Sequence, residues 1–190
     1  MGYHERVIPM GASAFFLGFV ISLSMAPAAG PERESLQVVP IIHDGTVLVS
    51  FKLDEALTDD IRAAIHSGMA VKLTYKVDLR RTAAAWFDRT IASAEVTATV
   101  KYDTLTRRYQ ISRAVDGRIE WADSTDREDA AWAALTSDFA RLSLFRGVPL
   151  EQNAEYYVRV RAHSTPRNAA FIWPWQADEA VGLAKFTFLR

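Results

Sequence analysis

Two groups of basic residues stand at alternate positions in segments that read as β-strands, and such rows can bind an anion. The first group is Lys72, Lys76 and Arg80, and the second is Arg159 and Arg161. Because strand side chains alternate between two faces, each group lies on one face of its strand. If the two strands are neighbours, this row of cations could receive an anionic lipid head group, a glycan or an acidic protein surface. The alternative is a solvated sheet face on which Asp78, Glu95 and Glu120 balance the charge.

A second candidate binding surface is aromatic. Phe171, Trp173 and Trp175 flank Pro174 in a segment without regular periodicity. Tryptophans beside a proline can form a rigid recognition patch, because aromatic side chains carry much of the binding energy of protein interfaces. The alternative is that this segment covers the open end of a sheet.

The histidines and clustered carboxylates do not form a recognisable catalytic or metal-binding motif. His43 precedes a turn, His66 stands in the last turn of a helix, and His163 ends a strand. The carboxylates of Asp59-Asp60 and Asp126–Asp129 fall in first helical turns, where they favour the helix dipole. Signatures of hydrolases, dinucleotide-binding folds and phosphate-binding loops are missing. We therefore expect no catalytic residue, cofactor or metal. An enzyme would require His43 or His163 to converge with two carboxylates in one cleft.

The first 28 residues have the three regions of a secretory signal peptide. A polar start with a weak positive bias leads into the apolar block Ala12–Ala26, and Ala26-Pro27-Ala28 offers a cleavage site after Ala28. The apolar block is shorter than the 20 or so residues, about 30 Å, that cross a bilayer. We expect an exported protein, in the periplasm or on the periplasmic face of the inner membrane. An uncleaved N-terminal anchor is the alternative.

Residues 29–190 are expected to form one domain, because their number suits a single hydrophobic core. The formal net charge is −1, so no strong field favours nucleic acid or an anionic membrane. Cysteine is absent, which excludes thiol catalysis and cysteine-ligated metals. Membrane contact is expected only through an uncleaved leader.

Alternation of apolar and polar residues predicts most of the strands. Segments 69–80 and 92–103 alternate almost without error, as in an antiparallel sheet with one buried face. Asp44-Gly45 and Asp116-Gly117 predict two-residue hairpin turns, because both central positions of such a turn need positive φ. Further strands are expected at Leu36–His43, Thr46–Leu53, Arg108–Val115, Gly117–Asp123, Glu155–Ser164 and Lys185–Arg190.

Two helices are expected among these strands. Their caps would be Thr58 for the first and Ser124 or Thr125 for the second, and their apolar stripes Ile61, Ala64 and Ile65, and Trp132, Leu135, Phe139 and Leu142. The first helix ends before Gly68, and the second, with a capping box between Thr125 and Glu128, runs to about Leu142. We predict an α+β fold, mostly antiparallel β-sheet (a curved sheet or sandwich-like), with two short-to-medium helices.

Four segments, in this order, resemble a known bacterial family. They are LTYKVDLRR at 73–81, WFD at 86–88, VKYDTLTRRY at 100–109 and EYYVRVR at 155–161. They are similar to domain-of-unknown-function family 4390, and the resemblance covers roughly Val47 to Arg190. It implies an exported protein of Gram-negative-type bacteria, in some cases encoded beside a membrane sensor kinase. It brings no activity and no catalytic residue.

The leader, the regular sheet and the lack of catalytic groupings together predict an exported envelope protein without enzymatic activity. We expect an interaction or accessory role near a membrane signalling or envelope system, with a membrane or periplasmic protein as partner. A sensor kinase as that partner rests on the family resemblance alone. The alternative is a small-ligand or lipid-binding domain of the periplasm, in which the curved sheet forms one wall of a pocket.

Overall fold

A computed structural model of the chain describes residues 36–54, 59–82, 88–165 and 180–189. The chain divides into a unit from Met1 to Glu32 and a unit from Arg33 to Arg190, and every described residue belongs to the second. The leader, the helix cap Thr58 and the aromatic residues Trp173 and Trp175 lie outside the described residues. The predictions made for them therefore stay predictions.

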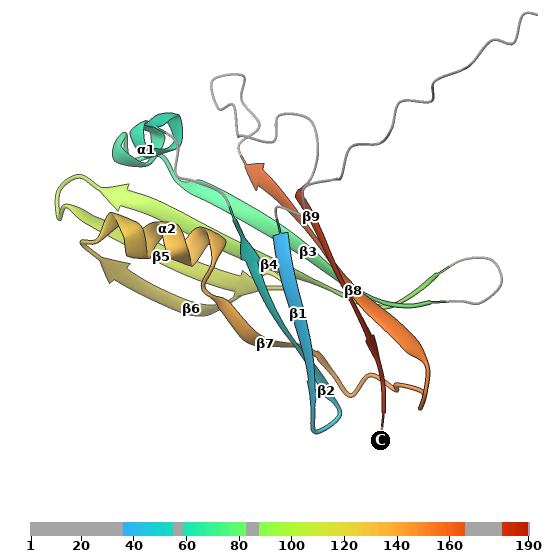
Figure 1. Cartoon of the computed structure of the whole chain (residues 1–190). Coiled ribbons are helices and arrows are strands. Elements are labelled where there is room, and N and C mark those ends of the chain that lie inside the picture. The colour runs from blue at the N-terminus through green and yellow to red at the C-terminus, as the bar shows by residue number, and fades with distance from the viewer. Residues whose placement is uncertain (1–35, 55–58, 83–87, 166–179, 190) are drawn as a thin grey trace, which may run out of the picture. The chain divides into compact units, whose positions relative to one another are not determined.

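The described chain forms two antiparallel sheets and two helices (Figure 1). In chain order the elements are β1 (Leu36–His43), β2 (Thr46–Leu53), α1 (Asp59–His66), β3 (Val71–Arg81), β4 (Arg89–Asp103), β5 (Arg108–Val115), β6 (Arg118–Thr125), α2 (Glu128–Thr136), β7 (Phe139–Arg146), β8 (Glu155–Thr165) and β9 (Ala180–Thr187). The larger sheet has the order β6-β5-β4-β3-β8-β9, and the smaller has the order β1-β2-β7. The predicted α+β class, mostly antiparallel sheet with two helices, is confirmed.

Both predicted hairpin turns are present. Asp44 and Gly45 have φ values of 47° and 69° between β1 and β2, and Asp116 and Gly117 have φ values of 48° and 77° between β5 and β6. These left-handed values match the twist of the flanking strands, which is why the two-residue turn joins them without splaying. The registers that follow pair Leu36 with Leu53 in one hairpin and most of β5 with β6 in the other.

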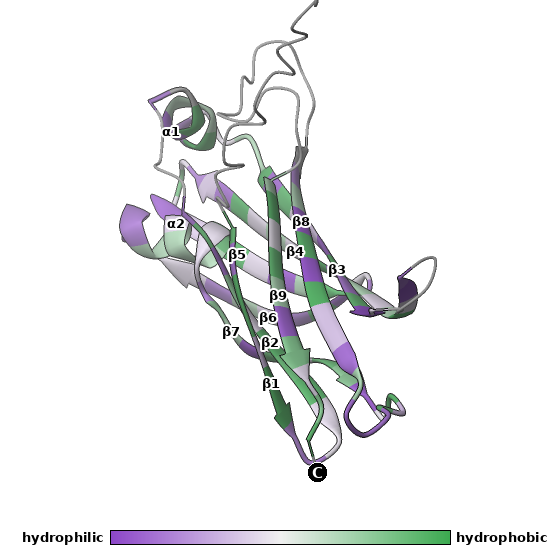
Figure 2. Cartoon of the chain, turned by 45° about the vertical axis from the view of Figure 1, so that its right-hand side comes forward, coloured by the Kyte–Doolittle hydropathy of each residue, from purple (hydrophilic) through white to green (hydrophobic). Residues whose placement is uncertain are grey.

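The alternation predicted for the long strands is also present, and Figure 2 shows it along β8. In the larger sheet, β3, β4 and β8 each turn an apolar face towards the smaller sheet and a polar face outwards. The inward residues at its centre are Val71, Leu73, Tyr75, Val77 and Leu79 of β3, Ala94, Val96, Ala98 and Val100 of β4, and Tyr156, Val158, Val160 and Ala162 of β8. They meet Val47, Val49, Phe51 and Leu53 of β2 to form one core.

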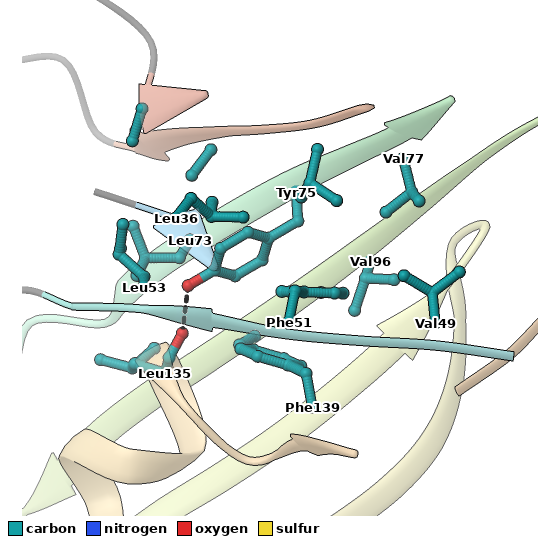
Figure 3. Close-up of a cluster of buried hydrophobic side chains, with 14 of the residues drawn as sticks. Leu36, Val49, Phe51, Leu53, Leu73, Tyr75, Val77, Val96, Leu135 and Phe139 are labelled. Atoms are coloured by element: carbon teal, nitrogen blue, oxygen red, sulfur yellow. Dashed lines mark hydrogen bonds between the residues drawn. The ribbon is translucent and has the colours of Figure 1, made fainter. Parts of the chain in front are cut away.

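Tyr75 lies at the centre of that core (Figure 3). Its side chain is fully buried, and its ring centroid lies 4.9 Å from that of Phe51 and 4.8 Å from that of Phe139. The Tyr75 hydroxyl donates a hydrogen bond of 2.6 Å to the carbonyl oxygen of Leu135 in the last turn of α2. Burial raises the pKa of Tyr75, so the hydroxyl keeps its proton and remains a donor. One side chain thus joins both sheets and a helix.

The end of the second helix differs from the sequence prediction. α2 stops at Thr136, and Phe139 and Leu142, expected on its apolar stripe, belong to strand β7. The register of β7 against β2 shifts between Val49 and Phe51, and Arg141 has a φ of 51°. As a result, Phe139 lies opposite Phe51 and Leu142 lies opposite Val49, both inward residues of β2. Two residues three positions apart in β7 therefore face the core, which is the spacing expected of a helix.

Two further boundaries were predicted wrongly. The expected capping box is not formed: the Thr125 hydroxyl oxygen accepts a hydrogen bond from the Arg127 N–H, and the Glu128 carboxylate accepts one of 2.9 Å from Arg62 on α1. The terminal strand begins at Ala180 and not at Lys185, because the whole of 180–187 pairs with β8.

Tyr75→Phe should destabilise the fold by about 1–2 kcal/mol, because it leaves the buried Leu135 carbonyl without its donor while keeping the ring. Urea unfolding followed by fluorescence measures this difference. Tyr102→Phe is the control, since that ring is only half-buried at the end of β4 and should cost less than about 0.5 kcal/mol. Equal losses in the two variants would contradict the central role of the Tyr75 hydroxyl.

Candidate functional site

The two predicted rows of cations lie side by side on the outer face of the larger sheet. β3 pairs with β8 so that Lys76 lies opposite Arg161, Asp78 opposite Arg159 and Arg80 opposite Tyr157. Residues directly opposite each other in an antiparallel pair share a face. β9 continues the same face and adds Lys185 opposite Tyr157. We define the basic face as Lys72, Lys76, Arg80, Arg159, Arg161 and Lys185.

Asp78 organises the centre of the basic face. Only 4% of its side chain is exposed, and its Oδ2 accepts hydrogen bonds from Nη2 of Arg159 (3.1 Å) and Nη2 of Arg161 (3.0 Å). Its Oδ1 accepts one of 2.7 Å from the Ser93 hydroxyl on β4. Burial alone would raise the pKa of Asp78, but the hydrogen bonds from Ser93 and Arg159 and the charges of both arginines outweigh it and lower the pKa. Asp78 is therefore ionised and fixes both guanidinium groups.

The other predicted cations have different surroundings. Arg80 extends towards the end of the sheet, where its guanidinium lies 5.6 Å from the centroid of the Tyr157 ring and donates to the Asp88 carbonyl oxygen. The Tyr157 hydroxyl donates a bond of 2.8 Å to the Asp88 carboxylate. Arg80 is thus held in a structural cluster. Lys72 and Lys76 are exposed on β3, towards the opposite end and at the middle of the face.

The acidic residues expected to balance this face do so only in part. Asp78 lies beneath the two arginines, and Glu95 lies opposite Lys76 on β4. Glu120 belongs to β6, which is separated from β8 by three strands. Over β3, β8 and β9, the described outward acids are Asp78 and Glu155, against the six cations of the basic face. The outer face of these three strands therefore carries a net positive charge.

Val181, Leu183 and Lys185 of β9 are parts of this surface that the sequence analysis missed. They lie outward, opposite Arg161, Arg159 and Tyr157 respectively. Val181 is 41% exposed and Leu183 is 40% exposed, so the two side chains add apolar area next to the arginines. Their alternation with Ala180, Gly182 and Ala184 was a usable signal, but the small inward residues gave it little contrast.

One cluster of side chains with chemical potential was not anticipated. His66 Nε2 lies 3.0 Å from the Tyr109 hydroxyl oxygen and 3.5 Å from Oε1 of Glu128, and its ring stacks on Tyr102 at 5.0 Å. Arg62 donates to the same Glu128 oxygen. These residues come from α1, β4, β5 and α2, so the cluster fastens α1 to the end of the larger sheet. Burial raises the pKa of Tyr109, which keeps its hydroxyl neutral.

The other histidines have ordinary surroundings. His43 lies 3.2 Å from the Asp44 carboxylate at the exposed β1–β2 turn, and His163 lies opposite Thr74 on the outer face of β8. Among the described residues, no three histidine, aspartate or glutamate side chains are grouped to hold a metal ion. In the part of the chain that the structure describes, both helices are too short to pass through a bilayer.

The inner face of the larger sheet is covered by the smaller one. Phe139 stacks on Phe51 with ring centroids 4.5 Å apart, and Leu36, Leu53 and Leu135 are buried beside them. These side chains occupy the position where a ligand would lie if the sheet formed one wall of a pocket. In the described residues, the inner face of these strands is therefore occupied by core side chains.

Asp78→Asn should destabilise the fold by about 2–3 kcal/mol at neutral pH, because a nearly buried charge is removed from two arginines that face it. The folded pKa of Asp78 is lowered, so its stabilising contribution is present above the unfolded pKa of about 4 and is lost as pH falls through the folded value. The difference in unfolding free energy between wild type and variant should therefore narrow below about pH 4.

Chemical denaturation at a series of pH values tests this expectation. Glu95→Gln is the control, because Glu95 is exposed and lies on the same face. Its effect should stay within about 0.5 kcal/mol at every pH. A gap between wild type and Asp78→Asn that is constant down to strong acid would contradict the assignment of Asp78 as an ionised, stabilising group.

Comparison with known proteins identifies a family. Residues 30–168 match the family described as "Domain of unknown function (DUF4390)", which includes β1 to β8 and ends before β9. Neither a curated protein nor a solved structure matches the chain. The four sequence segments that resembled this family lie within the matched residues. The match covers well over half of the chain, and the chain therefore belongs to the DUF4390 family.

Proposed function

We propose that this domain is a non-enzymatic interaction module of an exported protein, and that it binds an acidic protein surface through the basic face. The observation that carries the proposal is the convergence of Arg159 and Arg161 on the nearly buried Asp78. A carboxylate beneath two partly exposed guanidinium groups holds them in position before a partner arrives. Less side-chain entropy is then lost on binding than with mobile lysines.

The composition of the surface favours a protein as the partner. Arginine and exposed apolar residues lie together on β8 and β9, where Val181 and Leu183 adjoin the two arginines. Protein interfaces combine apolar contact with oriented polar groups in this way. The chain as a whole has a formal net charge of −1, which gives it no general attraction to nucleic acid or anionic lipid.

The contacts of the titratable side chains support a role without catalysis. The Glu128 carboxylate is held by Arg62, and the Tyr109 hydroxyl bonds to His66 at the junction of two helices with the sheet. These contacts fasten secondary-structure elements to one another, as expected of a structural cluster. The proposal therefore assigns them to stability and not to proton transfer.

We place the partner in the cell envelope, near a membrane signalling or envelope system. The apolar block Ala12–Ala26 and the small residues that follow support export. A membrane sensor kinase as partner is supported only by the family resemblance. The basic face thus supports directly only one part of the proposal, that the partner presents an acidic surface.

Site-specific photo-crosslinking in the native bacterium tests the binding surface. With a photoreactive amino acid in place of Lys72, we expect a discrete protein adduct, and Lys76→Glu should reduce its yield about fivefold, because it reverses a charge on the same face. Lys52→Glu is the matched control: Lys52 is an exposed lysine on β2 of the other sheet, and its reversal should leave the yield unchanged. Thermal unfolding confirms that both variants fold. No adduct, or one insensitive to Lys76→Glu, would contradict the proposal.

Export is tested by the N-terminus of the purified native protein. We expect cleavage after Ala28, so that Edman sequencing or intact mass shows a chain beginning at Ala29 in the periplasmic fraction. Ala28→Lys should prevent cleavage, because the site requires a small residue, whereas Pro27→Ser should not. A full-length chain in the membrane fraction would identify an uncleaved anchor, and a cytoplasmic chain would refute export.

A further inference from the structure

β9 forms one edge of the larger sheet, and within the described residues its strand partner is β8 alone. Both backbone groups of Phe188 bond to residues 153–154, on the β8 side. Because these groups alternate in direction along an antiparallel strand, every second residue before Phe188 also faces β8. The N–H and C=O groups of Val181, Leu183 and Lys185 therefore point away from the sheet. The same three residues carry their side chains on the outer face.

Within the described residues, four strands form sheet edges: β1, β7, β6 and β9. The first three are interrupted, whereas β9 is regular. β1 contains Pro40, and a proline on an edge strand removes one donor. The register of β7 against β2 shifts twice, and that of β6 against β5 shifts between Arg113 and Ala114. The β8–β9 register runs from Glu155 opposite Thr187 to Ala162 opposite Ala180 without a shift. β9 is thus the edge best able to continue a hydrogen-bond ladder.

The backbone of β9 is held in place from its inner side. A Cβ atom on Gly182 would overlap the carbonyl oxygen of Leu36 in β1, so glycine is required where the two strands pack against each other. This contact places β1 against the inner face of β9 and leaves its outer face with Val181 and Leu183 exposed. An edge that is already fixed loses little entropy when another strand joins it.

We propose that β9 accepts an extended segment of a partner protein as an additional strand. The proposal rests on the proposed function and specifies its partner. Side chains of that segment on the outer face would meet Val181, Leu183 and Lys185 in turn. Since outward positions alternate, the segment has two apolar residues and one acidic residue at every second position. Arg161 and Arg159 of β8 lie next to Val181 and Leu183 on the same face. Their charges attract acidic residues at either end of the partner segment.

The positive charge at the β9 edge disfavours a second copy of the chain and favours an acidic partner strand. Pairing of β9 with β9 of a second copy would place Lys185 of both chains on neighbouring strands, with Arg159 and Arg161 of each chain one strand further away on the same face. Such a surface collects like charges, which disfavour the pairing. An acidic, apolar strand has no such cost. The partner is therefore a different protein with an alternating apolar–acidic segment.

The test uses a synthetic peptide about nine residues long, in which two valines and a glutamate occupy alternate positions with threonines between them. This peptide is titrated into the isotope-labelled full chain, and the amide signals are followed by NMR. We expect the amides of Val181, Leu183 and Lys185 to shift and to become protected from hydrogen exchange. The same peptide with lysine in place of glutamate should bind about tenfold more weakly.

Two variants separate backbone pairing from side-chain contact. Leu183→Ala removes apolar area but keeps the outward N–H, and should weaken binding about threefold. Leu183→Pro also removes the N–H without breaking a bond to β8, and should weaken binding at least tenfold further. Thermal unfolding confirms that each variant is folded.

The remaining outcomes overturn the proposal in distinguishable ways. If the glutamate peptide shifts Lys72 and Lys76 and binds Leu183→Pro normally, strand addition is wrong but the basic face still binds acidic partners. Equal binding of the glutamate and lysine peptides would count against the proposed function as well. Concentration-dependent dimerisation that Leu183→Pro abolishes would show a second copy as the occupant, and binding to phosphatidylglycerol vesicles but to neither peptide would show a membrane.

Discussion

The hydrogen bond from Tyr75 to the Leu135 carbonyl is the constraint on which the arrangement of both sheets depends. A hydroxyl in an apolar core is costly unless it is paired, and the last carbonyls of a helix have no partner within the helix. Each group therefore supplies what the other lacks. The bond fixes the end of α2, and with it the place where Phe139 begins β7 and stacks on Phe51. The smaller sheet is positioned by a polar contact at the centre of an apolar cluster.

Local sequence patterns were sufficient for most strands and failed where a tertiary irregularity decided the outcome. The alternation in 69–80 and 92–103 and the Asp-Gly turns depend on neighbouring residues only, and they were predicted correctly. The boundary between α2 and β7 was not, because a register shift with a left-handed Arg141 gives Phe139 and Leu142 the spacing of a helical stripe. No propensity of the single residues distinguishes the two possibilities. The contact of Phe139 with Phe51, far away in sequence, does.

The candidate site was predictable to a similar extent. A period of two showed which cations share a face of each strand, but it could not show the register between β3 and β8, which pairs residues about 80 positions apart in sequence. That register turns Asp78 from an apparent solvated counter-ion into a nearly buried anchor for two arginines. The pairing of β9 with β8 makes β9 part of the same surface. Small residues at Ala180, Gly182 and Ala184 obscured the strand in the sequence, although Gly182 is required by the packing of β1.

The position of β3 between β4 and β8 governs the order in which the strands of the larger sheet can pair. The β4–β5 and β5–β6 pairs are local hairpins and can form before the rest of the domain is in place. β3, however, lacks its second neighbour until β8 (Glu155–Thr165) is made, and its outward edge stays unpaired until then. A long strand with one apolar face and an unpaired edge is prone to aggregate. The chain therefore carries an aggregation-prone edge from the completion of β3 until β8 is made.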